Sequence, residues 1–389
     1  MHAPFCLAAL ILGLLSSACH RGSGSANTTC PPNGSLPLAQ FKPRSKLHLA
    51  ETKVERLRFA AIDFHQHLAL PGSKHFVPPE DLIKVMDAHN VAMLVHLTGG
   101  QETLKIVMDT FVKPHPGRFM VFTEPDWEQL RHEDFGERLA ADVRQAVAQG
   151  ARGLKLLKWF GLGARHPNGQ LVRIDDPRFD PMWKACADLG IPVAIHSGDP
   201  EAFFDPVDGN NERYEELHAS PDWSYHDPKW PRLPNLLAAR DRVFARHPQT
   251  TFVALHVGGW PENLDYVSDM LKRNPNVWVD IGARQAELGR QPRRARLFFL
   301  EHQDRIVFGT DAAPAPWNDN GAKVFENYGR FLETEDEAFD YYASPVQGRW
   351  TISGVHLPEQ VLQKLYTDNA TNLFRQFKQP AGGPTTSPP

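Results

Sequence analysis

Short apolar runs alternate with amphipathic stretches along most of this chain. Each apolar run has the length of a buried β-strand and is followed by turn residues. The runs cover residues 58–65, 91–97, 119–123, 153–159, 191–196, 251–256, 277–281 and 305–311. Apolar residues in the intervening stretches recur about every 3.6 residues, which predicts amphipathic helices. We expect these helices over residues 79–89, 101–112, 135–149, 181–189, 234–246, 261–273 and 292–302.

Continuous apolar strands that are separated by helices are typical of a parallel sheet. Eight such strand–helix units in succession predict an α/β fold of the (β/α)8, or TIM-barrel, type. An open doubly wound sheet is the alternative, but no Gly-x-Gly-x-x-Gly sequence opens a helix after the first strand. We therefore expect a TIM barrel over residues 46–378, with a long insertion between the fifth strand and its helix.

The insertion, residues 199–230, is rich in aromatic side chains. Loops of this length are usually functional or disordered, and the aromatic content favours an ordered lid that receives an aromatic or sugar-like ligand. The alternative is that the insertion packs against a neighbouring subunit of a homo-oligomer. Residues 318–349, which are also aromatic, are expected to pack on the barrel, and residues 357–377 are expected to form a last helix.

The two ends of the chain differ from this body. An apolar run followed by Ser16-Ser17-Ala18-Cys19 predicts a secretory signal peptide over residues 1–18. This segment resembles the lipobox of bacterial lipoproteins, which implies that Cys19 is the lipidated first mature residue and that the exported protein faces the periplasm or the cell surface. An ordinary cleaved signal peptide is the alternative. Residues 20–45 are expected to be a flexible linker and residues 379–389 a disordered tail.

Composition restricts the possible partners. The 389 residues are 41% hydrophobic and carry a net charge of −4, which is ordinary for a globular protein with a sizeable core. Because no Lys/Arg-rich run occurs, we expect no nucleic-acid partner, and contact with a membrane only through the lipid anchor. Of the four cysteines, Cys30 and Cys186 would remain free after processing, and we expect Cys186 to be a core residue rather than part of a disulfide framework.

Polar residues gather at the ends of the predicted strands. The first strand ends in His65-Gln66-His67, and residues i and i+2 of a strand point to the same side, so both imidazoles can bind one metal ion. His196, His256 and Asp311 end the fifth, sixth and eighth strands. Each of these alone is equally typical of a hydrogen-bonded rim residue or a helix cap. Together they predict a metal site at the carboxyl ends of the strands, where barrel enzymes have their active sites.

Four sequence features together resemble the amidohydrolase superfamily. They are Asp-x-His-x-His at residues 63–67, the histidines that end strands five and six, Gly-Thr-Asp at residues 309–311, and residues 367–374. More narrowly, residues 55–377 resemble the amidohydrolase-related branch that includes aminocarboxymuconate-semialdehyde decarboxylase and γ-resorcylate decarboxylase. The resemblance implies four metal ligands, which are His65, His67, His196 and Asp311. It also implies that His256 is a catalytic acid or base beside the metal ion.

Lys155 and Lys158, in the fourth predicted strand, bear on the number of metal ions. In some members of the superfamily that the chain resembles, a carbamylated lysine at this strand end bridges two metals. Residues three apart in a strand face opposite sides, so only one of the two lysines is expected to point inward. We expect that lysine to bind an anionic substrate or to form an ion pair. A single metal ion is therefore expected, with a binuclear site as the alternative.

Two further residues are candidates for substrate binding. Arg284 follows the seventh strand and has the guanidinium geometry that binds a carboxylate through two hydrogen bonds. A salt bridge at the rim is the alternative for this residue. Asp199 follows the fifth strand and opens the long insertion.

The predicted ligand set suits zinc, with manganese or iron as alternatives. Such an ion with an open position lowers the pKa of bound water towards ~7, and Asp311 is placed to accept the proton while it binds the metal. We therefore predict a metal-dependent hydrolase that cleaves an ester, lactone or amide bond of a small organic substrate. A metal-dependent decarboxylase of a carboxylated aromatic or related acid is the first alternative. A catalytically inactive barrel that only binds a ligand is the second.

Overall fold

The structure, a computed structural model, describes residues 36–37, 40–312, 323–341 and 347–377. Eight short parallel strands follow one another in the order that the apolar runs predict. They are β1 (Ala61–Gln66), β2 (Val91–His96), β3 (Phe119–Val121), β4 (Leu154–Leu156), β5 (Val193–Ile195), β6 (Phe252–Ala254), β7 (Val277–Asp280) and β8 (Ile306–Val307). Several strands are shorter than expected, so only His65 still lies within its strand, and the other histidines and the aspartate follow the strand ends.

The strands form two parallel groups, β1-β2-β3 and β4-β5-β6-β7-β8. Backbone hydrogen bonds join the groups on both sides. Thr123 donates to Gly153 over 3.0 Å between β3 and β4, and Phe64 donates to Phe308 over 2.9 Å between β1 and β8. Parallel bridges at Thr123–Leu154 and Gln66–Ala312 lie beside these bonds. The chain therefore has the TIM-barrel fold that its sequence predicts.

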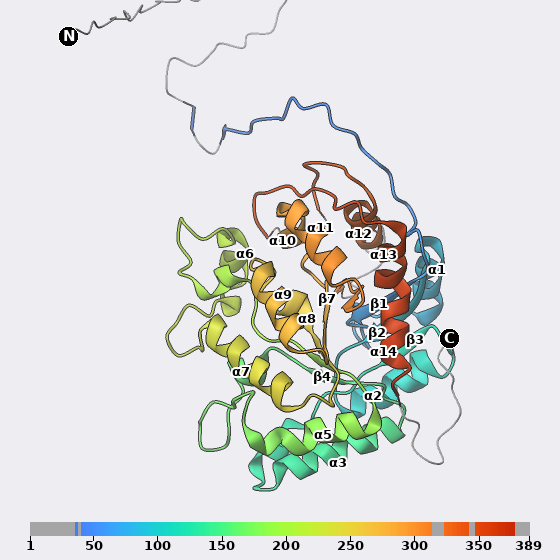
Figure 1. Cartoon of the computed structure of the whole chain (residues 1–389), viewed down its shortest axis with the longest axis vertical. Coiled ribbons are helices and arrows are strands. Elements are labelled where there is room, and N and C mark those ends of the chain that lie inside the picture. Colours follow the sequence, from blue (N-terminus) through green and yellow to red (C-terminus); the bar gives the residue numbers. More distant parts are fainter. Residues whose placement is uncertain (1–35, 38–39, 313–322, 342–346, 378–389) are drawn as a thin grey trace, which may run out of the picture. The chain divides into compact units, whose positions relative to one another are not determined.

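Helices alternate with the strands along the chain, and the longer ones lie around the strands (Figure 1). They are α1 (Pro79–His89), α2 (Gln101–Val107), α3 (Phe135–Ala148), α4 (Trp159–Leu162), α5 (Asp180–Leu189), α6 (Tyr214–Ala219), α7 (Leu233–Arg246), α8 (Leu255–Gly258), α9 (Leu264–Arg273), α10 (Gln285–Arg290), α11 (Pro292–Glu301), α12 (Lys323–Glu333), α13 (Glu359–Gln363) and α14 (Asn369–Phe374). Proline within the first turn of α1, α5, α7 and α11 fixes their beginnings. All seven helices that the sequence predicts are present.

One hydrophobic cluster contains side chains from five strands and from α14, so it fills the barrel interior. In this cluster Phe64 contacts Phe122 edge-to-face, with ring centroids 5.5 Å apart, and stacks on Phe374 at 5.9 Å. Full burial of such a side chain contributes roughly 1.5–3 kcal/mol. The pairing of β1 with β2 shifts register between Asp63 and Gln66. Such irregularities re-aim side chains, and here His65, next to the core residue Phe64, turns to the carboxyl-end rim.

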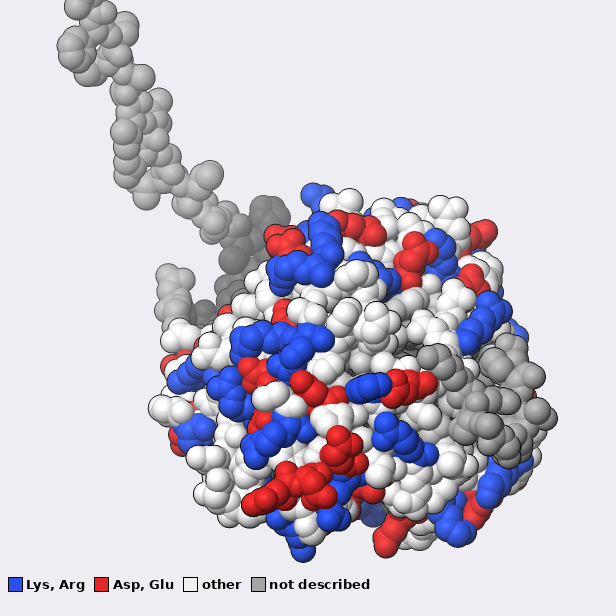
Figure 2. All heavy atoms as spheres, turned by 60° about the horizontal axis from the view of Figure 1, so that its bottom comes forward, with Lys and Arg blue, Asp and Glu red and all other residues white. Residues whose placement is uncertain are grey.

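The segments beyond the eighth strand pack on the barrel as expected where the structure describes them. Phe325, Tyr328 and Phe331 of α12 are buried, and α13 and α14 lie within the predicted last helix. Cys186 is buried in the core, and burial raises the pKa of its thiol. Within the described ranges, no helix is long and apolar enough to cross a membrane. Figure 2 shows acidic and basic side chains interspersed on one face.

Candidate metal centre

Asp311 brings the two histidines of β1 together. Its Oδ1 lies 3.1 Å from His65 Nε2 and 2.9 Å from His67 Nε2. One ligand atom from each of these three residues lies within 4.8 Å of the others, which is the spacing of a candidate metal site. His65 is fully buried, and the side chain of Asp311 is 23% exposed, so a path to the cavity remains on the Asp311 side.

The second ring nitrogen of each histidine has its own partner. His65 Nδ1 donates to Asp280 Oδ2 over 2.6 Å, and His67 Nδ1 contacts the Thr98 hydroxyl. A histidine that binds a metal through Nε2 needs a hydrogen-bond partner at Nδ1 to fix its tautomer and ring orientation. Both imidazoles therefore direct Nε2, the nitrogen that would bind a metal ion, towards Asp311.

His256 and His196 form a second pair across the rim. Ile195 pairs with Ala254 in register, so both histidines emerge near the same level. His256 Nδ1 lies 2.8 Å from the Gly282 carbonyl oxygen and can only donate to it. In neutral His256 the Nε2 is then an acceptor, and it lies 3.2 Å from His196 Nδ1, which donates.

This chain of hydrogen bonds also determines the protonation of the remaining nitrogen, His196 Nε2. With its proton on Nδ1, His196 presents a lone pair at Nε2. That nitrogen is buried and has no hydrogen-bond partner among the described residues, although it lies 3.5 Å from Asp199 Oδ1. The structure does not place it in one ligand group with His65, His67 and Asp311. The predicted role of His196 as a fourth ligand stays a prediction.

The pKa values follow this arrangement. Burial would raise the pKa of Asp311, but His65 and His67 outweigh it and hold that pKa well below the usual value. Burial would lower the pKa of His65, but mainly the Asp311 carboxylate, together with Asp280, raises it. Burial lowers the pKa of His196 to about 4. The pKa of His256 is also lowered, mainly by burial and further by His196 and Arg284. The carboxylate thus favours a charged His65, whereas the second pair stays neutral near pH 7.

Both lysines of the fourth strand region face the site, so the expectation that only one points inward is wrong. Lys155 lies in β4 and is buried, with Nζ 3.4 Å from His65 Nε2, and burial lowers its pKa to about 8. Lys158 lines the cavity, and its Nζ lies 2.7 Å from Asp199 Oδ2. The strand already ends at Leu156, and the alternation of sides that applies within a strand does not continue beyond it.

A cavity of about 390 Å³ opens beside the candidate ligands. Its wall includes residues from the rim and from the insertion, which are Lys158, His196, Asp199, Phe203, Arg213, Glu216, Trp223, His256, Arg284 and Asp311. Arg284 is 5% exposed, and its terminal nitrogen lies 3.9 Å from Asp199 Oδ1. The insertion is therefore an ordered wall of this cavity. A volume of this size suits a small organic ligand.

Sequence reasoning assigned no role to several residues that shape the site. Asp280 bonds to His65, and Thr98 contacts His67. Asp280 is a buried carboxylate directly after the apolar residues Val277–Val279, a signal that could have been read from the sequence. Arg213 and Glu216 pair over 2.6 Å in the cavity wall. Nothing in the sequence of the insertion distinguished them from surface residues.

The family profile described as Amidohydrolase matches residues 62–376. The chain belongs to the amidohydrolase family. Its members depend on metal ions, and the His and Asp cluster at the barrel rim of this amidohydrolase fits that requirement. The family and the fold thus identify the chain as an enzyme. A search of curated protein sequences gave no significant match.

Several solved structures are similar to this chain over most of its length. A dihydroxybenzoic acid decarboxylase from Polaromonas sp. JS666, with bound manganese and the inhibitor 2-nitroresorcinol, is 15% identical, with a TM-score of 0.51 over 81% of this chain and 97% of that chain. A 2,6-dihydroxybenzoate decarboxylase from Rhizobium is 17% identical (TM-score 0.49, covering 81% and 98%). A "probable 2-pyrone-4,6-dicarboxylic acid hydrolase" from Acinetobacter baumannii is 13% identical (TM-score 0.45, covering 81% and 99%). At 15% identity, the likeness to the Polaromonas structure shows the fold alone.

The residues of this amidohydrolase fit a divalent ion by their own chemistry. His65 and His67 each have Nδ1 engaged and Nε2 turned to the Asp311 carboxylate. His196 adds a buried nitrogen, Nε2, that makes no hydrogen bond within the described residues, and Asp199 Oδ1 lies 3.5 Å from it. Buried polar atoms without partners are rare in folded proteins. An ion held by imidazole nitrogens and a carboxylate would use these atoms.

Proposed function

We propose that this amidohydrolase is a hydrolase that uses one divalent metal ion to cleave an ester, lactone or amide bond of a small organic acid. The observation that carries the proposal is the His65–His67–Asp311 cluster, whose ligand atoms lie within 4.8 Å of one another, next to a cavity of about 390 Å³. Zinc is the proposed ion, with manganese or iron as the next candidates, because imidazole and carboxylate ligands suit all three.

When bound, the ion would supply a water molecule whose pKa is lowered towards ~7. His65, His67 and Asp311 would hold the ion, with His196 as a proposed fourth ligand. The Asp311 carboxylate is a hydrogen-bond acceptor on the cavity side and is proposed to take the proton of the attacking water. His256 lines the cavity and is proposed as the acid–base residue. Because its pKa is low, His256 is neutral near pH 7 and would receive the water proton from Asp311 before it passes that proton to the leaving group.

We assign binding of a substrate carboxylate to Arg284. Its guanidinium is buried in the cavity wall, and its nearest carboxylate contact is 3.9 Å, which is longer than a hydrogen bond. Lys158, by contrast, is already paired with Asp199. A bound anion would therefore pair more strongly with Arg284, whereas Lys158 and Asp199 would shape the pocket beside it. Lys155 lies nearest to His65 and would help to hold anionic groups close to the metal ion.

A decarboxylase is the second candidate. The same buried Arg284 beside His256 and Asp311 would also suit a carboxylated aromatic acid, and one similar fold is a dihydroxybenzoic acid decarboxylase with bound manganese. Incubation with a panel of esters, lactones, amides and aromatic acids separates the candidates. A hydrolase releases an acid together with an alcohol or amine, whereas a decarboxylase releases carbon dioxide and incorporates solvent deuterium into its product.

Elemental analysis of the purified protein tests the metal centre itself. We expect about one divalent ion per chain in the wild type and much less in His65→Ala and Asp311→Asn. His302→Ala is a matched control, because His302 is a buried histidine that bonds to Ser268 outside the site. A wild-type protein without stoichiometric metal would refute the proposal. If His256→Asn keeps both ligand affinity and the full rate of any reaction, His256 has no acid–base role; unchanged ligand in every assay would favour an inactive binding barrel.

We further propose that the protein is exported and anchored through lipidated Cys19. The support is the sequence of residues 1–19 alone, which lies outside the described residues. Expression in a bacterial host with radiolabelled palmitate tests this directly. We expect label in the wild type and none in Cys19→Ser. Label in neither form would leave only an unmodified signal peptide.

A further inference from the structure

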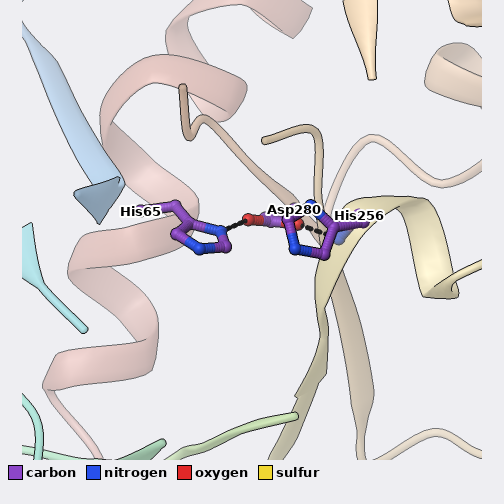
Figure 3. Close-up of side chains that lie close together, drawn as sticks. All are labelled: His65, His256 and Asp280. Atoms are coloured by element: carbon purple, nitrogen blue, oxygen red, sulfur yellow. Dashed lines mark hydrogen bonds and ion pairs between the residues drawn. The ribbon is translucent and has the colours of Figure 1, made fainter. Parts of the chain in front are cut away.

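Asp280, the last residue of β7, connects two histidines that come from β1 and from the segment after β6. Its side chain is fully buried. One carboxylate oxygen, Oδ2, accepts from His65 Nδ1 over 2.6 Å. The other, Oδ1, accepts from the backbone N–H of His256 over 2.5 Å. Figure 3 shows Asp280 between the two histidines with both contacts.

On the His65 side, the contact determines a tautomer. An ionised carboxylate only accepts hydrogen bonds, so the His65 proton lies on Nδ1. Nε2, the nitrogen that faces Asp311 over 3.1 Å, therefore carries a lone pair when the ring is neutral. A charge-assisted bond of this kind orients the ring and raises its strength as a ligand.

On the His256 side, the contact holds an unfavourable backbone. His256 and Val257 have φ angles of 58° and 55°, the left-handed region that L-residues with a side chain rarely adopt and that is least accessible to β-branched Val. Each such residue costs roughly 1–3 kcal/mol unless its surroundings hold it. The bond from the His256 amide to Asp280, together with that from His256 Nδ1 to Gly282, fixes this turn. This turn positions His256 Nε2 beside His196 Nδ1.

We propose that Asp280 is a positioning residue that sets the orientation of His65 and of His256 at the same time. The inference rests on the proposed metal-dependent function, since His65 and His256 are assigned there as metal ligand and acid–base residue. Asp280 itself does not line the cavity. It acts through the two histidines, because its carboxylate accepts a hydrogen bond from each of them.

A direct metal-binding role for Asp280 is the competing interpretation, because His65, His256 and Asp280 also bring ligand atoms within 4.8 Å of one another. Two observations oppose it. Both carboxylate oxygens already accept hydrogen bonds from protein N–H groups. Gly282 and Gly309 also pack closely, since a Cβ at either position would lie 3.0 Å or 3.2 Å from Asp280 Oδ2. Little room for an ion remains at that oxygen.

Asp280→Asn is the most informative variant, because it keeps the shape but replaces one acceptor by an amide donor. If the oxygen stays with the His256 amide, the NH₂ group faces His65 Nδ1 and forces its proton to Nε2. We expect metal affinity, measured by competition with a chromophoric chelator, to fall about 10–100-fold. We expect kcat to fall while KM changes little, because the substrate contacts are intact. Asp336→Asn is the control, since Asp336 is a buried aspartate that bonds to Thr52 and Arg330.

A measurement on the metal-free wild type keeps the inference testable even if Asp280→Asn does not fold. Imidazole ¹⁵N shifts, with His65 assigned by its absence in His65→Gln, report the tautomer. We expect a proton on Nδ1 throughout, both in the charged ring that Asp311 favours and in the neutral ring, where Nδ1–H is the expected tautomer. An Nε2–H form would overturn the inference, as would an Asp280→Asn protein with wild-type metal affinity and rate. Two bound ions in the wild type and one in Asp280→Asn would instead make Asp280 a ligand. A purified wild type that contains no metal would refute the proposed function. The tautomer of His65 would still test the role of Asp280, because it is measured on metal-free protein.

Discussion

The two sides of the barrel rim organise their histidines differently. At β1 and β8, two imidazoles point their Nε2 atoms at one carboxylate, Asp311, over about 3 Å. At β5 and β6, no carboxylate lies between the rings, and His196 donates to His256, which donates to a backbone carbonyl. The pKa of His65 is accordingly raised, whereas burial lowers the pKa of His196 to about 4.

This contrast teaches how one rim can hold a cation and also move a proton. A carboxylate flanked by imidazoles forms a site that attracts positive charge. Neutral imidazoles in a hydrogen-bonded chain with one lone pair left over form a site that can accept a proton or complete a ligand set. Asp280 accepts a hydrogen bond from each side and so holds the two sides in a fixed relative position.

The largest effect should come from removal of the shared carboxylate. Asp311→Asn keeps the shape but leaves His65 and His67 facing a neutral amide, so we expect loss of bound metal and a fall in kcat/KM on the order of 10³-fold or more. Metal content and turnover of the same preparation measure both. The control Asp336→Asn should retain metal content and turnover. An Asp311→Asn protein with full metal content would mean that the β1–β8 side is not the metal centre.

A second test compares the two sides directly. If His196 completes the ligand set, both His67→Ala and His196→Ala should weaken metal binding by at least about 100-fold, as measured by chelator competition. If His196 only orients His256, then His196→Ala should retain metal and lower kcat alone. That second result would confine the metal to the β1–β8 side and would show that the lone pair at His196 Nε2 serves another purpose.

Arg284 lies between the sides and should affect substrate binding more than chemistry. Once a substrate is found, Arg284→Lys should raise KM about 10–100-fold for an anionic substrate, with a smaller change in kcat, because Lys cannot form the paired hydrogen bonds of a guanidinium. Steady-state kinetics with the acid and its methyl ester provide the control. Equal KM changes for the acid and the ester would contradict carboxylate binding by this residue.

The effect furthest from catalysis concerns stability beside the site. Burial, aided by the charge of His67, lowers the pKa of His96 to about 3, so the unfolded chain takes up a proton at higher pH than the folded one. The free energy of unfolding should therefore fall by up to about 1.4 kcal/mol per pH unit as the pH drops from 6.5 towards 3. His96→Asn keeps an acceptor for the Leu68 amide and should flatten this slope in urea titrations of metal-free protein. An unchanged slope would contradict a neutral buried His96.

Most of the fold could be predicted because it follows from local patterns. The eight apolar runs became β1–β8, and proline in the first turn marked the starts of several helices. Strand ends were less predictable. The prediction for the fourth strand extended to Trp159, but β4 ends at Leu156, and this difference of three residues is why both Lys155 and Lys158 face the site.

The candidate site could be predicted in its residue types but not in its bonds. His65, His67 and Asp311 meet as expected because the carboxyl ends of parallel strands share one rim. The role of Asp280 and the bond between His196 and His256 were not predicted. Hydrogen-bond partners depend on distances of a few tenths of an ångström between elements far apart in the sequence, and no local pattern records them.

By itself, the sequence determined a parallel barrel whose histidines and aspartates end the strands, because side-chain periodicity and the placement of polar residues are local properties. Only the tertiary structure decided which nitrogen of each imidazole carries the proton, which carboxylate lies among the rings and which merely supports them. Those choices depend on how the register shift in β1, the left-handed turn at His256 and the close packing at Gly282 bring separate strands into contact. Such contacts arise only when the ring of strands closes.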